Sequence, residues 1–118
     1  MGRKKVGANR EAATWLALLG ATIRLGRIER GWTQHDLATR IGASANTVAA
    51  IEKGSPSTSV GLVLNAASMT GVPLFGAQNS DQLRTASRVT QTILALLPKR
   101  VRPATVEPRS TGPLSVRV

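Results

Sequence analysis

Apolar residues recur at helical spacing through most of the chain, and glycine or proline follows each run. Leu16, Leu19 and Ile23 lie three and four residues apart, which is the spacing of one face of an α-helix. The pattern predicts a first amphipathic helix over about residues 10–30, which Gly31 ends. Later runs share this spacing, so the sequence predicts an all-α fold of about five helices.

Two short helices joined by a glycine turn are predicted next. Thr33 is a good N-cap residue, and Asp36 at the third helical position is a short substitute for the glutamate of a capping box. This helix ends at Gly42, where glycine tolerates a positive φ angle. Ser44 then caps another short helix, which Gly54 ends. The residues expected to pack between them are Leu37, Ala38, Ile41, Val48 and Ile51.

Two further helices complete the helical pattern. Ser59 is expected to cap a fourth helix that ends at Gly71. Its apolar face is expected to consist of Val60, Val63, Leu64 and Ala67. Asn79 or Ser80 opens a fifth helix, which Pro98 breaks. The apolar face of this helix is expected to consist of Leu83, Ala86, Val89, Ile93, Leu96 and Leu97.

The composition changes after the fifth helix. Prolines stand at 98, 103, 108 and 113 with basic residues between them, and apolar residues are few. Such a segment cannot offset the entropy of its own ordering, so we expect it to be disordered, or extended when bound to a partner. Its last five residues, 114–118, alternate like a strand. We expect 99–118 to be mobile in the isolated protein and to order on a protein partner, which is the second subunit or a toxin.

The two short helices have the spacing of a helix-turn-helix unit. A small residue, Ala38, lies where the helices cross, and Gly42 occupies the turn. Val48 and Ile51 then anchor the later helix. Each feature is weak alone, but together, with one helix before and one after, they are specific. The alternative is a four-helix core with no role in nucleic-acid binding.

Charge favours a polyanionic partner. The chain has 16 Lys and Arg residues against 6 Asp and Glu, a net charge of +10. Residues 1–10 carry +4, residues 11–83 carry 0 and residues 84–118 carry +6. A polyanion would therefore be bound partly by the two basic ends, although basic ends can also serve only to keep a small protein soluble.

The residue inventory excludes most chemistry. There is no Cys, which rules out disulfides and thiolate metal sites, and a single His, His35, provides no histidine cluster. No carboxylate or nucleophile is spaced to act with His35, and no glycine-rich phosphate loop is present. We therefore predict no enzyme activity, catalytic residue, metal or cofactor. No apolar stretch is long enough for a membrane span, and we expect a cytoplasmic protein, nucleoid-associated when bound to DNA.

Four motifs lie within about residues 16–75: Leu19-Gly20-x-x-Ile23-Arg24, Gly31-Trp32-Thr33-Gln34-x-Asp36-Leu37-Ala38, Gly42-x-Ser44-x-x-Thr47-Val48 and Ile51-Glu52-Lys53-Gly54. Together they resemble the XRE class of lambda-repressor-like helix-turn-helix proteins. The resemblance implies a helical bundle whose third helix enters the major groove of DNA. It also implies an internal ion pair, which falls here on Arg27 and Glu52; the alternative is a surface pair of little energetic value.

Within this class the chain resembles short HipB-type antitoxins and the regulators encoded beside HipA-like kinases. The residues that carry this similarity are Ser55–Gly61, after the predicted recognition helix, and Leu97–Arg102. A prophage or stand-alone regulator is the alternative. The resemblance implies a HipA-like kinase as a toxin partner.

The predicted chain organisation has four parts. Residues 1–9 are a basic N-terminal arm, 10–75 a helix-turn-helix DNA-binding domain, 76–97 a C-terminal helix and 98–118 a proline-rich basic tail. A DNA-binding module of this size buries little surface, so we expect a homodimer. The candidate dimer surface is the end of the fifth helix, which carries Ile93, Leu94, Leu96 and Leu97.

The predicted DNA-contacting residues fall into two groups. Ser44, Asn46 and Thr47 begin the recognition helix and are expected to read bases. Only Asn46 can make a bidentate contact, with adenine. Because Ala45 and Ala50 occupy positions where relatives have long polar side chains, we expect modest specificity that DNA shape assists. The expected phosphate-binding residues are Gln34, Arg40, Lys53 and Ser55.

Together these features predict a sequence-specific repressor that binds double-stranded DNA, and the antitoxin of a kinase-type toxin is a narrower form of this prediction. Two other classes stay open. One is an interaction protein that primarily neutralises a toxin, with DNA binding secondary. The other is a basic nucleoid or RNA-binding protein, which the neutral segment 11–83 argues against.

Overall fold

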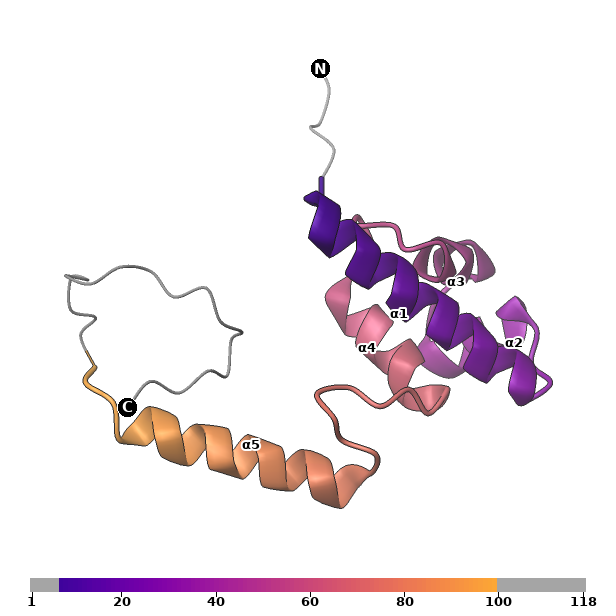
Figure 1. The fold of residues 1–118 in the computed structure, drawn as a ribbon. Helices are drawn as coiled ribbons and strands as arrows, with labels where there is room; N and C mark the ends of the chain where they lie inside the picture. The colour runs from indigo at the N-terminus through magenta and orange to yellow at the C-terminus, as the bar shows by residue number, and fades with distance from the viewer. Residues whose placement is uncertain (1–6, 100–118) are drawn as a thin grey trace.

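The computed structural model describes residues 7–99, and it contains five helices and no strand within that range (Figure 1). The all-α class and the number of helices are thus confirmed. Residues 100–118 of the predicted tail over 98–118, and residues 1–6 of the predicted arm over 1–9, lie outside the described residues. The helices are α1 Arg10–Glu29, α2 Gln34–Ile41, α3 Ala45–Glu52, α4 Val60–Met69 and α5 Ser80–Ala95.

Local capping signals fix most of the helix starts. Thr33 precedes α2 as predicted: its Oγ1 accepts a hydrogen bond from the Asp36 N–H at 3.0 Å, and Asp36 Oδ2 accepts one from the Thr33 N–H at 2.8 Å. Gly42 ends α2 with a φ of 71°. The side chain of Asn79 caps α5. Ser59 is also the N-cap residue of α4, but its side chain makes no capping hydrogen bond.

The capping box at α2 gives the stability of the protein a pH dependence. The hydrogen bond from the Thr33 N–H is the main cause that lowers the pKa of Asp36 from its usual 3.8. Because the folded state holds this carboxyl ionised, its contribution is complete above the usual pKa and is lost as pH falls through the lowered one. We therefore expect Asp36→Asn to lower the thermal midpoint at pH 6 and to cost less near pH 3. Thermal denaturation at both values checks this; an equal cost at each pH would contradict it.

Four helices enclose the core. Ile23 of α1, Leu37 of α2 and Val48 of α3 have no exposed surface, and the alanines Ala66 and Ala67 of α4 are also fully buried. The small alanine side chains allow α4 to approach the other helices closely. The predicted core residues of α2 and α3 are all buried, which confirms how these two helices pack.

The predicted inner face of α4 is partly wrong. Val63 and Ala67 are buried, but Val60 is 73% exposed and Leu64 is 45% exposed. The helix instead packs through Val63, Ala66 and Thr70, the last of which donates its hydroxyl to the Ala66 carbonyl at 2.7 Å. Because this hydroxyl bonds to a backbone carbonyl of its own helix, a threonine can lie in the core.

Helix α5 lies apart from the other four. It extends beyond the bundle after the segment 70–79, and none of its residues is buried (Figure 1). The predicted helix exists, although it ends at Ala95, three residues before Pro98. Its predicted apolar face is thus exposed along most of its length, and only its first turn, at Leu83, lies beside Leu64 and Leu74.

Candidate nucleic-acid interface

Helix α3 is anchored in the core on one side, and the other side of its first turn is exposed to solvent. Val48 and Ile51 are buried against α1 and α2, and this anchors the helix. Ser44 and Asn46 lie on the exposed side, and Thr47 is half-buried beside them. The structure thus brings the three predicted base-reading residues together on one short, rigidly packed turn.

Hydrogen bonds distinguish these three residues. Ser44 Oγ accepts from the Thr47 N–H at 3.1 Å and lies 3.0 Å from Thr47 Oγ1, so the two hydroxyls serve the helix cap. Within residues 7–99 the Asn46 side chain has no hydrogen-bonding partner. Its carboxamide therefore offers both a donor and an acceptor, the pair that an adenine edge requires.

Gln34 lies at the N-terminus of α2, but its amide is not fully available. Its Nε2 donates a hydrogen bond to Glu52 Oε1 at 3.2 Å, and the residue is half-buried. This contact orients the side chain and connects the N-terminus of α2 to the end of α3. One amide hydrogen remains for a phosphate oxygen, so phosphate binding by Gln34 stays a prediction.

The other predicted phosphate-binding residues lie at two places. Arg40 is in the last turn of α2, where its Nη1 donates to the Asp36 carbonyl at 3.1 Å and its guanidinium lies 4.1 Å from the centroid of the Trp32 ring. Lys53 is the exposed C-cap residue of α3. Ser55 follows it, and its Oγ accepts from the Ser57 N–H at 3.3 Å. Of the predicted phosphate-binding residues, therefore, only Lys53 and Ser55 lie at the C-terminal end of α3.

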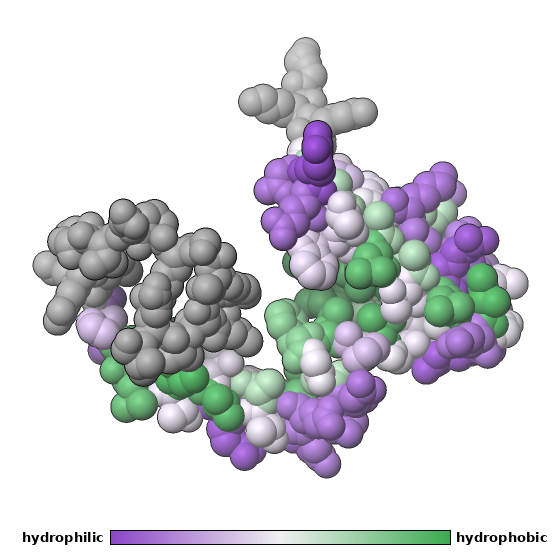
Figure 2. Space-filling view, viewed as in Figure 1, coloured by the Kyte–Doolittle hydropathy of each residue, from purple (hydrophilic) through white to green (hydrophobic). Residues whose placement is uncertain are grey.

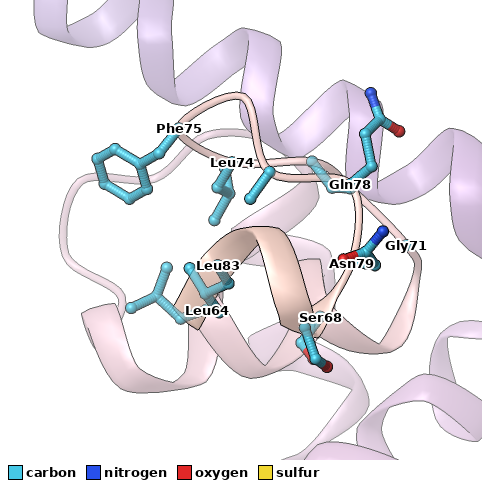
Figure 3. A pocket seen from close by; sticks show the side chains of 11 residues that line it. Leu64, Ser68, Gly71, Leu74, Phe75, Gln78, Asn79 and Leu83 are labelled. Carbon is cyan, nitrogen blue, oxygen red and sulfur yellow. The ribbon is translucent and has the colours of Figure 1, made fainter. Parts of the chain in front are cut away.

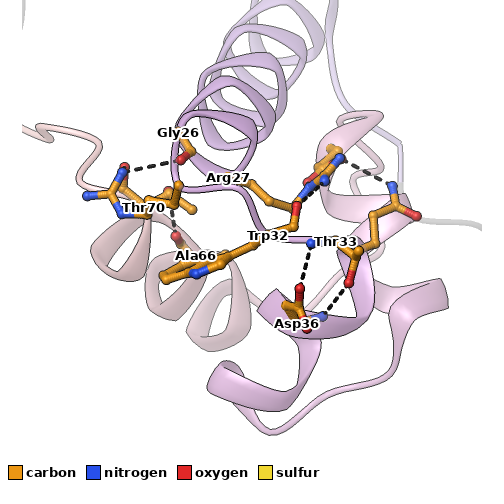
Figure 4. A network of polar contacts seen from close by, with 10 residues as sticks. Gly26, Arg27, Trp32, Thr33, Asp36, Ala66 and Thr70 are labelled. Atoms are coloured by element: carbon orange, nitrogen blue, oxygen red, sulfur yellow. Dashed lines mark hydrogen bonds and ion pairs between the residues drawn. The ribbon is translucent and has the colours of Figure 1, made fainter.

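The predicted ion pair of Arg27 and Glu52 forms, as part of the polar network drawn in Figure 4. Arg27 Nε donates to Glu52 Oε2 at 2.6 Å, and Nη2 donates to Oε1 at 3.1 Å. The third nitrogen, Nη1, donates to the Trp32 carbonyl at 2.8 Å. The two side chains are 10% and 3% exposed, so this is a packed bidentate pair that joins α1 to the end of α3.

The sequence analysis did not predict two residues whose hydrogen bonds hold the helices together, Trp32 and Arg30. The carbonyl of Trp32 accepts from Arg27, and Arg30 Nη1 donates to the carbonyls of Thr70 at 2.8 Å and Gly26 at 3.2 Å. Arg30 thereby ties the end of α1 to the end of α4. Backbone carbonyls have no residue-type signature, so no sequence pattern indicates such partners.

Over residues 7–99 no three His, Asp or Glu side chains gather as metal ligands would. In the same range no helix has the length and apolarity that crossing a membrane requires.

The fold and the exposed turn of α3 define a helix-turn-helix protein. A family model described as a helix-turn-helix domain matches residues 18–76, half of the chain, and the protein belongs to this family. The class is that of DNA-binding transcription regulators. Among solved structures, the crystal structure of the clp gene regulator ClgR from Corynebacterium glutamicum is similar, with 26% sequence identity and a TM-score of 0.42. The match covers 67% of this chain and 84% of that one. No curated protein matches the sequence.

Proposed function

We propose that the protein is a non-enzymatic, sequence-specific repressor that binds palindromic DNA as a homodimer. The observation that carries the proposal is the first turn of α3, where the unpartnered carboxamide of Asn46 projects from a helix that Val48 and Ile51 anchor in the core. A side chain on a rigid element can be held at the geometry that base readout requires. The site of action would be the cytoplasm, on chromosomal DNA.

Specificity in this proposal rests on few groups. Ala45, Ala49 and Ala50 are half-buried and can offer no more than contact with a thymine methyl group. Lys53 and Ser55 lie beside the same helix and would position it on the phosphates. The expected behaviour is modest discrimination between sequences, assisted by DNA shape, over a salt-dependent background.

Replacement of Asn46 by alanine tests the base-reading role. We expect Asn46→Ala to weaken binding to the cognate site by about 1–3 kcal/mol and to leave binding to random DNA nearly unchanged, because only the cognate site presents the matching base edge. The cognate site is first obtained by footprinting on the promoter of the protein's own gene, and affinities are then measured by gel shift on both DNAs.

The matched control is Asn65→Ala, which removes the same group from an exposed position on α4. This variant should bind both DNAs as the unaltered protein does. Equal losses on cognate and random DNA for Asn46→Ala would show that Asn46 does not read a base.

A second candidate function is neutralisation of a kinase-type toxin, as in HipB-type antitoxins of the XRE class. The observation that favours it is an apolar face of α1 turned away from the core. Leu18, Leu25 and Ile28 lie seven and three residues apart on this face and are 58%, 57% and 53% exposed. A helical face of this kind suits a protein partner more than DNA.

The gene neighbourhood and a binding assay separate the two candidates. If a HipA-like kinase gene is adjacent, the purified kinase should bind the unaltered protein and lose affinity for Leu25→Glu, with DNA binding retained. Retained kinase binding by Leu25→Glu would exclude this face, and absence of a kinase gene would favour the stand-alone repressor.

A further inference from the structure

A groove lies where the bundle meets the start of α5. Leu64 of α4, Leu74 of the connecting segment and Leu83 of α5 form its apolar side, and Figure 3 shows Leu74 directed toward the other two. Its volume is about 390 Å³, within the range of roughly 300–1,000 Å³ that is typical of small-molecule sites. Figure 2 shows hydrophobic surface on the side of the bundle that faces α5. The groove is therefore large enough and apolar enough to hold a small organic molecule.

The other end of the groove is polar. Ser68 and Asn79 line this end, and Figure 3 shows them on the side away from Phe75. Within residues 7–99 the Ser68 hydroxyl has no hydrogen-bonding partner. Asn79 Oδ1 caps α5 by accepting from the Gln82 N–H at 2.9 Å, and in the same range the Asn79 amide group donates to no other residue. The polar end therefore offers a hydroxyl and an amide as hydrogen-bond donors.

Phe75 lies at the edge of this groove in a strained conformation. Its φ is 55°, in the left-handed region that bulky residues avoid, and the residue is 89% exposed. A hydrogen bond from the Ala77 N–H to the Leu74 carbonyl at 2.9 Å closes the turn, in which Gly76 has a φ of 73°. Asparagine or glycine suits the position of Phe75 better. Because neither its backbone nor its ring gains from this placement within the described chain, Phe75 points to a contact with another molecule.

We propose that the groove binds a neutral amphiphile, a small molecule with an apolar chain or ring and an uncharged group that accepts hydrogen bonds. The apolar part would lie against the three leucines, and the ring of Phe75 would cover it. The uncharged group would accept hydrogen bonds from Ser68 and Asn79. The inference goes beyond the proposed function and does not depend on it, because the site consists only of α4, the connecting segment and the start of α5.

The charges around the groove determine the class of ligand. None of the residues that line the groove is charged. Arg30 lies beside Gly71 but does not line the groove, and its Nη1 donates to the carbonyls of Gly26 and Thr70. A carboxylate or an ammonium group would therefore lose water in the groove without gaining a partner of opposite charge. A neutral amide, ester or alcohol loses less on transfer from water and matches the donors at the polar end.

The first test titrates the full-length protein with three amphiphiles that share an eight-carbon chain: octanamide, octanoate and octylammonium. Amide resonances in NMR spectra show where each one binds, and their shifts give the dissociation constant. We expect octanamide to shift the signals of Leu64, Ser68 and Leu83 saturably and to bind roughly ten-fold or more tightly than either ion, because only the ions lose water without gaining a counter-charge. Tighter binding of octanoate, or shifts spread over the bundle without saturation, would overturn the inference.

Two substitutions test the two ends of the groove. Leu64→Glu places a charge on the apolar side and should weaken octanamide binding by roughly 20-fold or more. Ser68→Ala removes one hydrogen bond and should weaken it by roughly five-fold. The matched controls are Val60→Glu and Ser57→Ala, at exposed positions outside the groove, and both should bind octanamide as the unaltered protein does. Unchanged affinity in Leu64→Glu would overturn the site, and unchanged affinity in Ser68→Ala would overturn the role of its polar end.

Phe75→Asn tests whether the strained turn serves the ligand. Asparagine before Gly76 is the preferred pair for a turn with two positive φ angles, so this variant should have a higher thermal midpoint than the unaltered protein. It should also bind octanamide several-fold more weakly, because the ring that covers the apolar part is gone. A lower thermal midpoint would show that Phe75 serves the folded state itself, and unchanged octanamide affinity would show that its ring does not contact the ligand.

The outcomes separate this inference from the proposed function. Leu64→Glu should lose octanamide and keep its affinity for cognate DNA, because Leu64 lies on α4 and not on the first turn of α3. Saturable octanamide binding by a protein with no preference for any DNA would retain the inference and refute the repressor. A full-length protein that binds DNA specifically and none of the three amphiphiles would overturn the inference and leave the repressor standing. Loss of octanamide binding as the protein concentration rises would show that a second copy covers the groove, and would overturn the inference as well.

Discussion

Replacement of Glu52 by alanine is expected to remove about 3–5 kcal/mol from the free energy of unfolding, because it leaves the guanidinium of Arg27 buried without its partner charge. Glu52 is only 3% exposed at its side chain and accepts hydrogen bonds from both Arg27 and Gln34. Domains of this size have 5–15 kcal/mol in total, and each kcal/mol lowers the thermal midpoint by about 4–8 °C. Thermal and urea denaturation measure the loss.

Two controls distinguish a buried charge from a general loss of contacts. Asp81→Ala breaks the exposed ion pair with Arg84 and should change stability by no more than about 0.5 kcal/mol. The double variant Arg27→Met with Glu52→Leu removes both charges and should recover much of the loss, since neither charge is then left alone. A double variant as unstable as Glu52→Ala would mean that packing, not charge, holds this site together.

The structure shows which parts of the fold can be predicted from local sequence. Thr33 and Ser44 could be predicted as helix starts, and Asn79 as one of two candidates with Ser80, because a capping side chain bonds to the backbone only three residues away. The glycine at position 42 was predicted as the turn because its backbone conformation is equally local. Such signals depend on no distant part of the chain, and these helix starts follow from them.

Local sequence signals do not show which surface a helix packs against. The spacing of Leu83 and Ile93 correctly predicted a helix, but the same spacing fits a helix that packs on its own bundle and one that packs on another chain. In α4 the pattern favoured Leu64 as a core residue, whereas the structure buries Ala66 and Thr70. Periodicity identifies a face of a helix only to within about one residue of rotation, and tertiary contacts decide the rest.

In the candidate site, too, local features could be predicted from the sequence and tertiary contacts could not. The position of Asn46 on the exposed side of α3 followed from the spacing of Val48 and Ile51, which fixes the buried side. The stacking of Arg40 on Trp32 and the bond from Gln34 to Glu52 join residues that no local pattern connects. Local sequence patterns therefore could not show that Arg40 and Gln34 are partly engaged within the protein.

Helix α1 crosses the end of α3 at very short range, and Gly20 makes this approach possible. A Cβ atom at Gly20 would lie 2.6 Å from the Glu52 carbonyl oxygen and closer still to that of Ile51. Both obstacles are backbone atoms, so no change of side-chain rotamer can relieve the overlap. Any side chain at this position must push α1 away from α3.

We therefore expect Gly20→Ala to destabilise the protein by about 3 kcal/mol, although alanine is the better helix former by about 1 kcal/mol. Gly61→Ala is the matched control: it lies in α4, and its added Cβ would meet only Ser59 Oγ at 3.7 Å. That variant should gain stability by up to about 1 kcal/mol. Opposite signs for the same substitution, measured by urea denaturation, would establish that helix contact rather than helix propensity decides the outcome at Gly20.

Since the displaced end of α3 carries Glu52, the losses from Gly20→Ala and Glu52→Ala should also be less than additive when combined. Strict additivity would place the overlap and the ion pair in separate parts of the fold, and a stabilised Gly20→Ala would show that α1 and α3 do not cross as closely as the structure indicates.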